Sequence, residues 1–209
     1  MNPKLNLIFS RRSIRQYTNA EVPPDLVRDL LEAAMAAPSA CCKDPWHFVV
    51  VHDRNTLATI AQRLPNGQML AACPVGIVVC GDLRQAHDGQ LSYLLQDCSA
   101  AIENILLAAT ALDLGACWLG IHPREERISH VRGILGLPDH IVPQSAIAVG
   151  WPAETKAARM QARTIDPDNI DRLYERYLAR IPYKANGCRF HSFVVYFANL
   201  VRLGWVEPT

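Results

Sequence analysis

The pattern of hydrophobic positions is clearest between Gly89 and Gly120, where a long apolar segment precedes the residues ACWLG. Apolar side chains recur there at helical spacing, and alanines keep the remaining sides small. As a helix, Gln90 to Asp113 would be about 36 Å long, roughly the diameter of a small domain. We therefore predict a long, buried central helix with the other elements packed around it. The recurring apolar residues are Leu91, Leu94, Leu95, Cys98, Ile102, Ile105, Leu106, Ala109 and Leu112.

Shorter patterns on both sides of this segment predict further helices and strands. Runs of β-branched residues indicate buried strands, and apolar residues at helical spacing after a proline or a capping residue indicate helices. The predicted strands are HFVVVH after Trp46, Val75 to Cys80, Trp118 to Ile121, and SAIAVG ending at Gly150. The predicted helices start at Asn2, Pro23, Asn55, Pro123 and Asp166, and the last of them ends at Arg180. Strands separated by helices favour an α+β or α/β layer in which helices cover a mixed sheet.

Composition limits the class of protein. The 209 residues are 50% hydrophobic and 20% charged, which is typical of one globular domain with a sizeable core. A net charge of +1 gives no overall field that would attract nucleic acid or an anionic membrane. Seven cysteines without a C-x-x-C pair suit reduced thiols, and the N-terminus lacks the apolar region of a signal peptide. Because no apolar run is suited to crossing a membrane, we expect a cytoplasmic protein.

Two short motifs are candidates for ligand binding. In RRSIR, Arg11, Arg12 and Arg15 lie close to Ser13, and planar guanidinium groups suit a phosphate or a carboxylate. The alternative is a solvated basic helix end. The segment PSACCKDPW opens with small, rigid residues that let the backbone approach a flat ligand closely. Its alternative is an ordinary connection from helix to strand, with Trp46 in the core.

Other candidate sites are less specific. GACWLG places glycines on both sides of a short strand, which indicates either tight packing or backbone N–H groups available to a ligand. Cys41 and Cys42 are adjacent, a poor geometry for a disulfide, and the histidines lack partners at zinc-ligand spacing. Neither G-x-G-x-x-G nor the P-loop pattern occurs. We expect no metal site, and the sequence offers no evident catalytic acid, base or nucleophile.

Taken together, four segments resemble the nitroreductase family of FMN-dependent oxidoreductases. They are RRSIR, PSA followed by PW, QDCSAAIENILLAATALDLGACWLG, and SAIAVGWP, and their order and spacing match the family over roughly residues 4–165. The resemblance implies a three-layer α+β fold and a homodimer built around long central helices, with FMN at the interface. It also implies a ping-pong reaction, in which NAD(P)H passes hydride to flavin N5 and leaves before an acceptor such as a nitroaromatic or a quinone binds.

The resemblance also assigns residues to the flavin. The first motif would hold the FMN phosphate, the PSA residues of the other subunit would lie against the isoalloxazine ring, and backbone N–H groups would point at flavin N5 and O4. The implied phosphate-binding residues are Arg11, Arg12, Ser13 and Arg15, completed by Arg159 or Arg163. The implied ring contacts are Pro38, Ser39 and Ala40, with N–H groups from Leu119 and Gly120. Because the flavin performs the chemistry, no catalytic side chain is required.

Two features depart from the family pattern. Cys42 and Asp44 stand where the family usually has Asn and Gln, so the contact at Cys42 differs, and an ionised Asp44 near the ring would lower the flavin potential. The segment after Arg180 does not resemble the family. We therefore expect an FMN-binding domain over residues 1–180 and a tail over 181–209, which is either an arm exchanged with the partner subunit or a divergent segment. Alternative functions are an FMN-binding protein with little turnover, serving as a flavin store or sensor, and a relative with a specific biosynthetic substrate.

Overall fold

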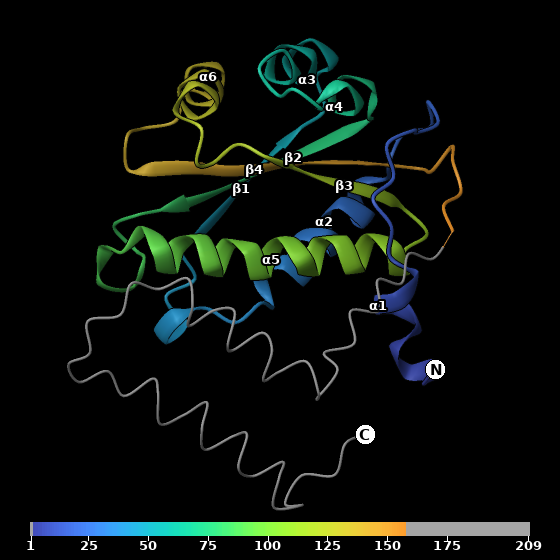
Figure 1. Cartoon of the computed structure of the whole chain (residues 1–209), viewed down its shortest axis with the longest axis horizontal. Coiled ribbons are helices and arrows are strands. Elements are labelled where there is room, and N and C mark those ends of the chain that lie inside the picture. The colour runs from blue at the N-terminus through green and yellow to red at the C-terminus, as the bar shows by residue number, and fades with distance from the viewer. Residues whose placement is uncertain (1, 158–209) are drawn as a thin grey trace, which may run out of the picture. The chain divides into compact units, whose positions relative to one another are not determined.

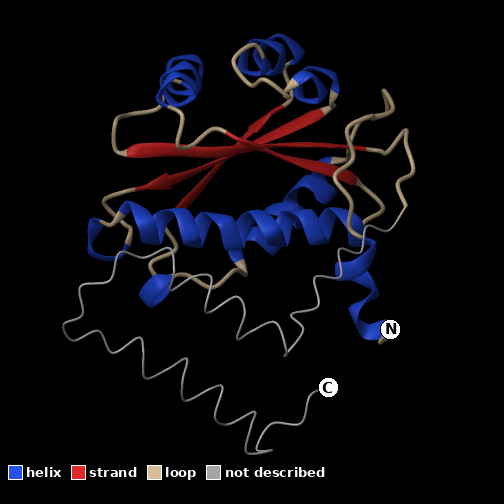
Figure 2. Cartoon of the chain, in the orientation of Figure 1, coloured by secondary structure: helices blue, strands red, loops and turns tan. Residues whose placement is uncertain are grey.

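Helices cover both faces of a four-stranded sheet in the computed structural model, which describes residues 2–157 (Figures 1 and 2). The strands are β1 (Trp46–Val51), β2 (Val75–Asp82), β3 (Gly115–Gly120) and β4 (Ile141–Gly150). Helices α2 (Pro24–Met35) and α5 (Leu91–Ala111) pack on one face, and α3 (Arg54–Ala61), α4 (Gln68–Ala72) and α6 (Glu125–Leu135) pack on the other. A short helix α1 (Asn6–Ser10) follows a 3-10 turn over Pro3–Leu5. The described residues thus have the three layers expected from the sequence.

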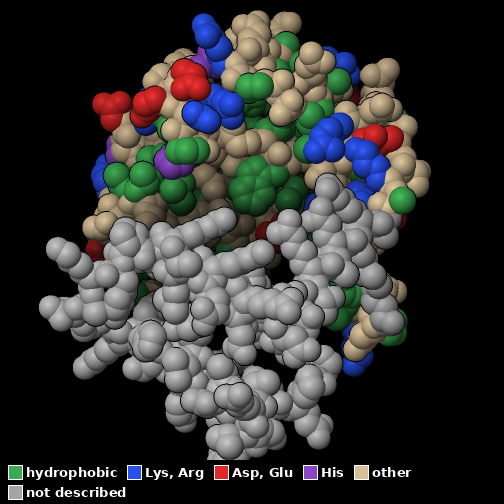
Figure 3. All heavy atoms as spheres, in the orientation of Figure 1, with side chains coloured by type: hydrophobic (Ala, Val, Ile, Leu, Met, Phe, Trp, Pro, Cys, Tyr) green, Lys and Arg blue, Asp and Glu red, His purple; other side chains and the backbone are tan. Residues whose placement is uncertain are grey.

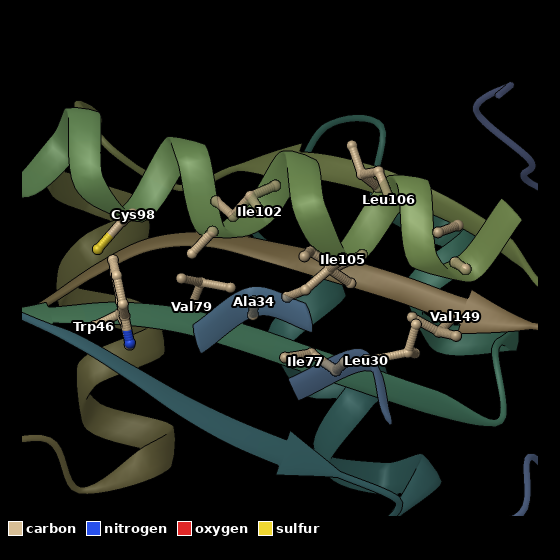
Figure 4. Close-up of a cluster of buried hydrophobic side chains, with 14 of the residues drawn as sticks. Leu30, Ala34, Trp46, Ile77, Val79, Cys98, Ile102, Ile105, Leu106 and Val149 are labelled. Carbon is tan, nitrogen blue, oxygen red and sulfur yellow. The ribbon is translucent and has the colours of Figure 1, made fainter. Parts of the chain in front are cut away.

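The predicted central helix is α5, and its 21 residues run along one face of the sheet (Figure 1). The core on this face is formed where α5 and α2 meet β2 and β4, as the side chains of Leu30, Ile77, Ile105 and Val149 illustrate in Figure 4. Burial of each such side chain stabilises the fold by about 1.5–3 kcal/mol.

Burial of α5 on all sides, however, is not observed. Leu91 and Tyr93 each remain 38% exposed, and Leu95, Ala100 and Ala108 are only partly buried. Among the described residues, only one side of the helix is fully covered. An apolar sequence shows that a surface avoids water, but it does not show which chain covers that surface.

The expectation of a mixed sheet is wrong for these four strands. They lie in the order β1-β2-β4-β3, and every neighbouring pair is antiparallel. Strands β2 and β3, which α5 connects, run in the same direction, as a strand–helix–strand unit predicts. They never pair, because β4 lies between them. Within residues 2–157, the parallel pairing found is a single bridge between Ser13 and Ala116.

Element boundaries also differ from the predictions. The helix expected from Asn55 to Leu64 ends at Ala61, and a second short helix, α4, follows the PNG turn. Strand β4 begins at Ile141, four residues before the predicted SAIAVG, because a bulge lets it continue past Pro143. Strand β3 covers Gly115–Gly120 rather than Trp118 to Ile121. The helix predicted after Asp166 and the boundary at Arg180 lie outside the described residues.

Gly115 lets the N-terminal segment approach the sheet closely. The Ile14 N–H donates to the Ala116 carbonyl at 3.0 Å, so Ile14 packs directly against the start of β3. A Cβ atom on Gly115 would lie 2.7 Å from Ile14 Cγ2 and 2.8 Å from its Cβ. Any side chain at position 115 must therefore displace Ile14 and the residues on either side of it.

We expect Gly115→Ala to lower the free energy of unfolding by about 1–3 kcal/mol, as is usual for a methyl group forced into a packed site. Urea denaturation measures this difference. Gly133→Ala is the matched control, because a Cβ there meets nothing within 4 Å. Gly133 lies inside α6, where alanine stabilises a helix by about 0.5–1 kcal/mol relative to glycine. Equal stability of Gly115→Ala and the unmodified protein would contradict the close approach.

Candidate functional site

Residues 11–17, called here the arginine arm, lie along the outer edge of β3. The bridge between Ser13 and Ala116 fixes their position along the strand. The Tyr17 hydroxyl lies 2.6 Å from the Ile14 carbonyl oxygen and 3.2 Å from that of Ala148, so it links the arm to β4. In Figure 3, basic side chains gather on the side of the molecule where Figure 1 places this segment. The fold therefore holds the RRSIR motif next to the sheet.

Glu154 and Lys156 hold the arm from the other side. The Glu154 carboxylate accepts the backbone N–H groups of Arg15 and Gln16 and pairs with Lys156 Nζ at 2.8 Å. Lys156 Nζ also donates to the Ser13 carbonyl at 2.7 Å. These donors favour the charged carboxylate, so the pKa of Glu154 lies below its ordinary value, with the Lys156 hydrogen bond as the largest cause.

Cys117 is a buried residue of β3 that lines the same pocket as Arg15. Burial raises the pKa of this thiol, and the charges of Arg15, Lys156 and Arg11 offset part of that rise. Ser13 is anchored beside this strand by its bridge to Ala116 and by the Lys156 hydrogen bond to its carbonyl. Arg11, Ser13 and Arg15 belong to one short segment, and Lys156 is hydrogen-bonded to it, a combination suited to a phosphate or a carboxylate.

Arg11 and Arg12 differ in their partners. Arg11 Nε lies 3.6 Å from Glu103 Oε1 of α5. The Arg12 guanidinium donates to main-chain carbonyls, at 2.7 Å to Phe9 and 2.9 Å to Ala157. Arg12 thus fastens the arm to neighbouring backbone, while its predicted contact with the ligand stays a prediction.

Among residues 2–157, no strand pairs with the outer edge of β3 beyond the arm, and this part is called here the free edge. Because polar backbone groups alternate between the two edges of a strand, the outward carbonyl of Ala116 places those of Trp118 and Gly120 on the outer edge as well. The Gly120 carbonyl accepts a hydrogen bond from Arg127 there. The N–H of Leu119 points the other way, toward its partner Ala146 on β4. Of the two predicted N–H donors, the pairing therefore favours Gly120 and not Leu119.

A pocket lies along this free edge and contains three of the predicted site residues, Arg15, Leu119 and Gly120. It extends to the turn between α3 and α4 and to the first turn of α6. Its lining also includes Leu64, Pro65, Asn66, Met69, Cys117, Trp118 and Arg127. Asn66 and Arg127 in the pocket, and Glu154 and Lys156 beside the arm, are not among the residues predicted from the sequence. The PNG turn could have pointed to Asn66, and the basic segment ETKAARMQAR to Glu154 and Lys156, whereas no motif in the sequence marks Arg127.

The predicted ring-contact residues lie in a different cluster, near the N-terminal half of α5. The Ala40 N–H donates to the buried Asp97 carboxylate at 2.9 Å. The Ser39 hydroxyl and the Asp44 side chain are hydrogen-bonded, and Ser39 Oγ accepts the Asp44 N–H at 3.0 Å. Trp46 is buried in the core, as the alternative interpretation of this segment required. Asp97 and Asp44 therefore fix the shape of the loop around Pro38, Ser39 and Ala40.

Backbone conformation in this loop is unusual. Cys41, Cys42 and Asp44 all have a positive φ, of 52°, 52° and 47°. Non-glycine residues in this region cost about 1 kcal/mol or more each, so the surrounding contacts must hold them there. Both thiols are exposed, and Cys41 Sγ lies 3.9 Å from His87 Nε2.

Three further predictions concern the remaining arginines, metal binding and membrane spans. Arg159 and Arg163 lie outside the described residues. Within residues 2–157, no group of three or more His, Cys, Asp or Glu side chains could hold a metal ion. No helix in that range is long and apolar enough to span a membrane.

Comparison with known proteins identifies the family. A model of the nitroreductase family matches residues 8–68 and 60–151. The chain belongs to the nitroreductase family. A protein of Methanothermobacter thermautotrophicus, provisionally named NADH dehydrogenase/NAD(P)H nitroreductase, is 43% identical to it over 166 residues, which are 79% of this chain and 84% of that protein.

Solved structures of nitroreductases share the fold. A protein of Parabacteroides distasonis with the same provisional name has a TM-score of 0.73 and 35% identity, and the match covers 89% of this chain and 100% of the other. A nitroreductase with bound FMN from Bacteroides fragilis has a TM-score of 0.64 and 25% identity, covering 79% of this chain and 98% of the other. The family resemblance of the four sequence motifs is thus confirmed.

In this member of the nitroreductase family, we expect Glu154→Ala to increase amide exchange at Arg15 and Gln16 by about tenfold. That is the effect of losing about 1.5 kcal/mol of charge-assisted hydrogen bonding. Hydrogen–deuterium exchange measures it, and Glu32→Ala, which removes an exposed carboxylate from α2, is the control.

The effect of Glu154→Ala on amide exchange at Arg15 and Gln16 should depend on pH. Because the pKa of Glu154 is lowered in the folded state, its contribution is present above the ordinary glutamate pKa of about 4.3 and is lost as the pH falls below it. Exchange rates of the unmodified protein and of Glu154→Ala should therefore converge in acid. Rates that differ equally at all pH values would show that the charge of Glu154 does not hold the arm.

Proposed function

We propose that this chain is an FMN-dependent oxidoreductase that takes hydride from NAD(P)H and passes it to an electrophilic acceptor such as a nitroaromatic or a quinone. One observation carries the proposal. Arg15, from the cationic arm, and Gly120, from the free edge of β3, line the same pocket. A ligand with an anionic end and a flat ring that accepts hydrogen bonds would contact both.

The arm fits the phosphate of FMN. Arg11 and Arg15 lie in one short segment with Ser13, Lys156 Nζ donates to the Ser13 carbonyl at 2.7 Å, and Ser13 adds a hydroxyl group. A phosphate at this position would form charge-assisted hydrogen bonds, which are about twice as strong as neutral ones. Lys156 joins the residues predicted from the sequence, and Arg159 or Arg163 would extend the same basic segment.

The free edge of β3 fits the isoalloxazine ring of FMN. A Cβ atom on Gly120 would meet its nearest neighbour only at 3.9 Å, so packing does not require a glycine here and the space beside it is open. The N–H on the free edge would face the ring atoms that become electron-rich on reduction, where a fixed donor is most effective. The flavin supplies hydride transfer at N5, and the chain supplies binding, orientation and electrostatics.

A second copy of the chain would complete the site. We propose a homodimer in which Pro38, Ser39, Ala40 and Cys42 of one subunit contact the flavin of the other. Apolar residues on the uncovered side of α5 and on the N-terminal turns support it, because such surfaces mark interaction sites. The exposed apolar residues are Leu5, Leu7, Ile8, Phe9, Leu91 and Tyr93.

A second candidate function is an FMN-binding protein with little turnover. The hydrogen bonds between Ser39 and Asp44 support it, since they occupy a side chain that the family resemblance assigns to the ring. The six cysteines among the described residues are free, which suits the reducing cytoplasm for either function.

We expect the purified protein to be yellow, with the visible absorption bands of bound flavin. Anaerobic addition of NADH or NADPH should bleach these bands, and a nitroaromatic or a quinone should restore them. Bound flavin that neither nucleotide reduces would favour the second candidate. A colourless protein that remains colourless after incubation with excess FMN would contradict both.

Replacing Arg11 and Arg15 together by Ala should remove FMN from a protein that stays folded. Loss of two charge-assisted contacts of about 1.5–3 kcal/mol each should raise the FMN dissociation constant by at least a hundredfold. Fluorescence titration measures the constant, and circular dichroism checks the fold.

Arg28→Ala combined with Arg63→Ala is the control for this experiment, because both arginines are exposed and lie outside the pocket. It removes the same net charge. Unchanged affinity in the arm variant would place the phosphate elsewhere, and equal losses in both variants would indicate a long-range charge effect.

A further inference from the structure

Arg127 is a pocket residue to which the proposed function gives no role. It lies in the first turn of α6 and lines the pocket with Arg15, Trp118 and Gly120. A cation in the first turn of a helix is unfavourable, because the helix dipole is positive at that end. Helix stability therefore does not explain why an arginine stands at this position.

Among the described residues, the Arg127 side chain makes one hydrogen bond. Its guanidinium donates to the Gly120 carbonyl at 3.0 Å. Gly120 is exposed and pairs with Ser145 of β4 on one edge only, and the Arg127 hydrogen bond holds its carbonyl on the other edge. The hydrogen bond anchors the chain where β3 leaves the sheet, next to the N–H that faces the pocket.

The charge of Arg127 is not neutralised within the described part of the chain. Lys156 pairs with Glu154 and Arg11 with Glu103, whereas no carboxylate there pairs with Arg127. A guanidinium has five N–H donors, and one interaction with Gly120 leaves others available. The pocket therefore holds an unpaired positive charge beside Gly120, in addition to Arg15.

We propose that Arg127 stabilises the reduced form of the bound flavin and anchors the Gly120 backbone beside its ring. The inference rests on the proposed function. Reduction adds two electrons and one proton to the ring, which leaves one net negative charge on it. A nearby cation in a partly water-excluded pocket stabilises that charge far more than it stabilises the neutral oxidised ring. Arg127 thus raises the reduction potential, while the arginine arm sets affinity for the phosphate.

The test compares affinities for oxidised and reduced FMN. In Arg127→Gln, which keeps N–H donors and loses the charge, affinity for reduced FMN relative to oxidised FMN should fall about tenfold. Arg127→Lys, which keeps the charge, should retain most of the preference for reduced over oxidised FMN. Spectroscopic titration against a redox dye, with dithionite as the reductant, measures the potential from which the ratio follows. Arg124→Gln is the matched control, because Arg124 is exposed just before α6 and does not line the pocket.

Amide exchange in the absence of flavin tests whether Arg127 anchors the Gly120 backbone. In the flavin-free protein, Arg127→Ala should accelerate amide exchange over residues 119–122, and Arg124→Gln should not.

The inference would be overturned if Arg127→Gln left the ratio of affinities for reduced and oxidised FMN unchanged, or if Arg124→Gln changed it equally. FMN binding by the unmodified protein would still keep the proposed function intact. Loss of affinity for oxidised and reduced FMN to the same extent would assign Arg127 to binding alone and would also overturn it. An unmodified protein that binds no FMN would overturn both.

Discussion

The close approach of the arginine arm to the outer edge of β3 is the constraint on which the site depends. One edge of β3 pairs with β4, and the arm occupies only the first part of the other, at Ala116. Gly115 makes this possible, because any side chain there would meet Ile14. The rest of the edge stays open to the pocket. Cationic side chains and an unpaired backbone donor thus come from one short strand and the segment fastened to it.

A bulge in β4 sets the other end of β3. Gln144 has no partner on β2, since Val79 pairs with Ser145 and Cys80 with Pro143. Its carbonyl instead accepts the N–H groups of Ile121 and His122, and its side-chain amide donates to Ser99 of α5 at 2.9 Å. The bulge therefore ends β3 directly after Gly120 and ties this end to the long helix. The strand is thus positioned at both ends, and among the described residues no strand pairs with its outer edge between Ala116 and Gly120.

The sequence predicted best what depends on local burial. Strand β2 is buried along its whole length and α5 has a strong helical repeat, so both were found close to their true bounds. Strand order was not predictable, because the insertion of β4 between β2 and β3 is decided by pairing far along the chain. The same holds for the site. RRSIR was recognisable as a motif, but the Glu154 carboxylate that holds it lies 139 residues from Arg15, and no local pattern connects them.

Charge pairing separates the cations of the site into two groups. Arg11 and Lys156 have carboxylate partners, and Arg12 is directed to main-chain carbonyls. Arg15 and Arg127 pair with no carboxylate in residues 2–157, and these are the two arginines that line the pocket. Because no carboxylate among these residues pairs with Arg15 or Arg127, their charges are not neutralised locally, and they act most strongly where water is excluded. Positive potential therefore lies along the free edge of β3. This potential favours a ligand such as FMN, which has a negatively charged phosphate and whose ring gains a negative charge on reduction.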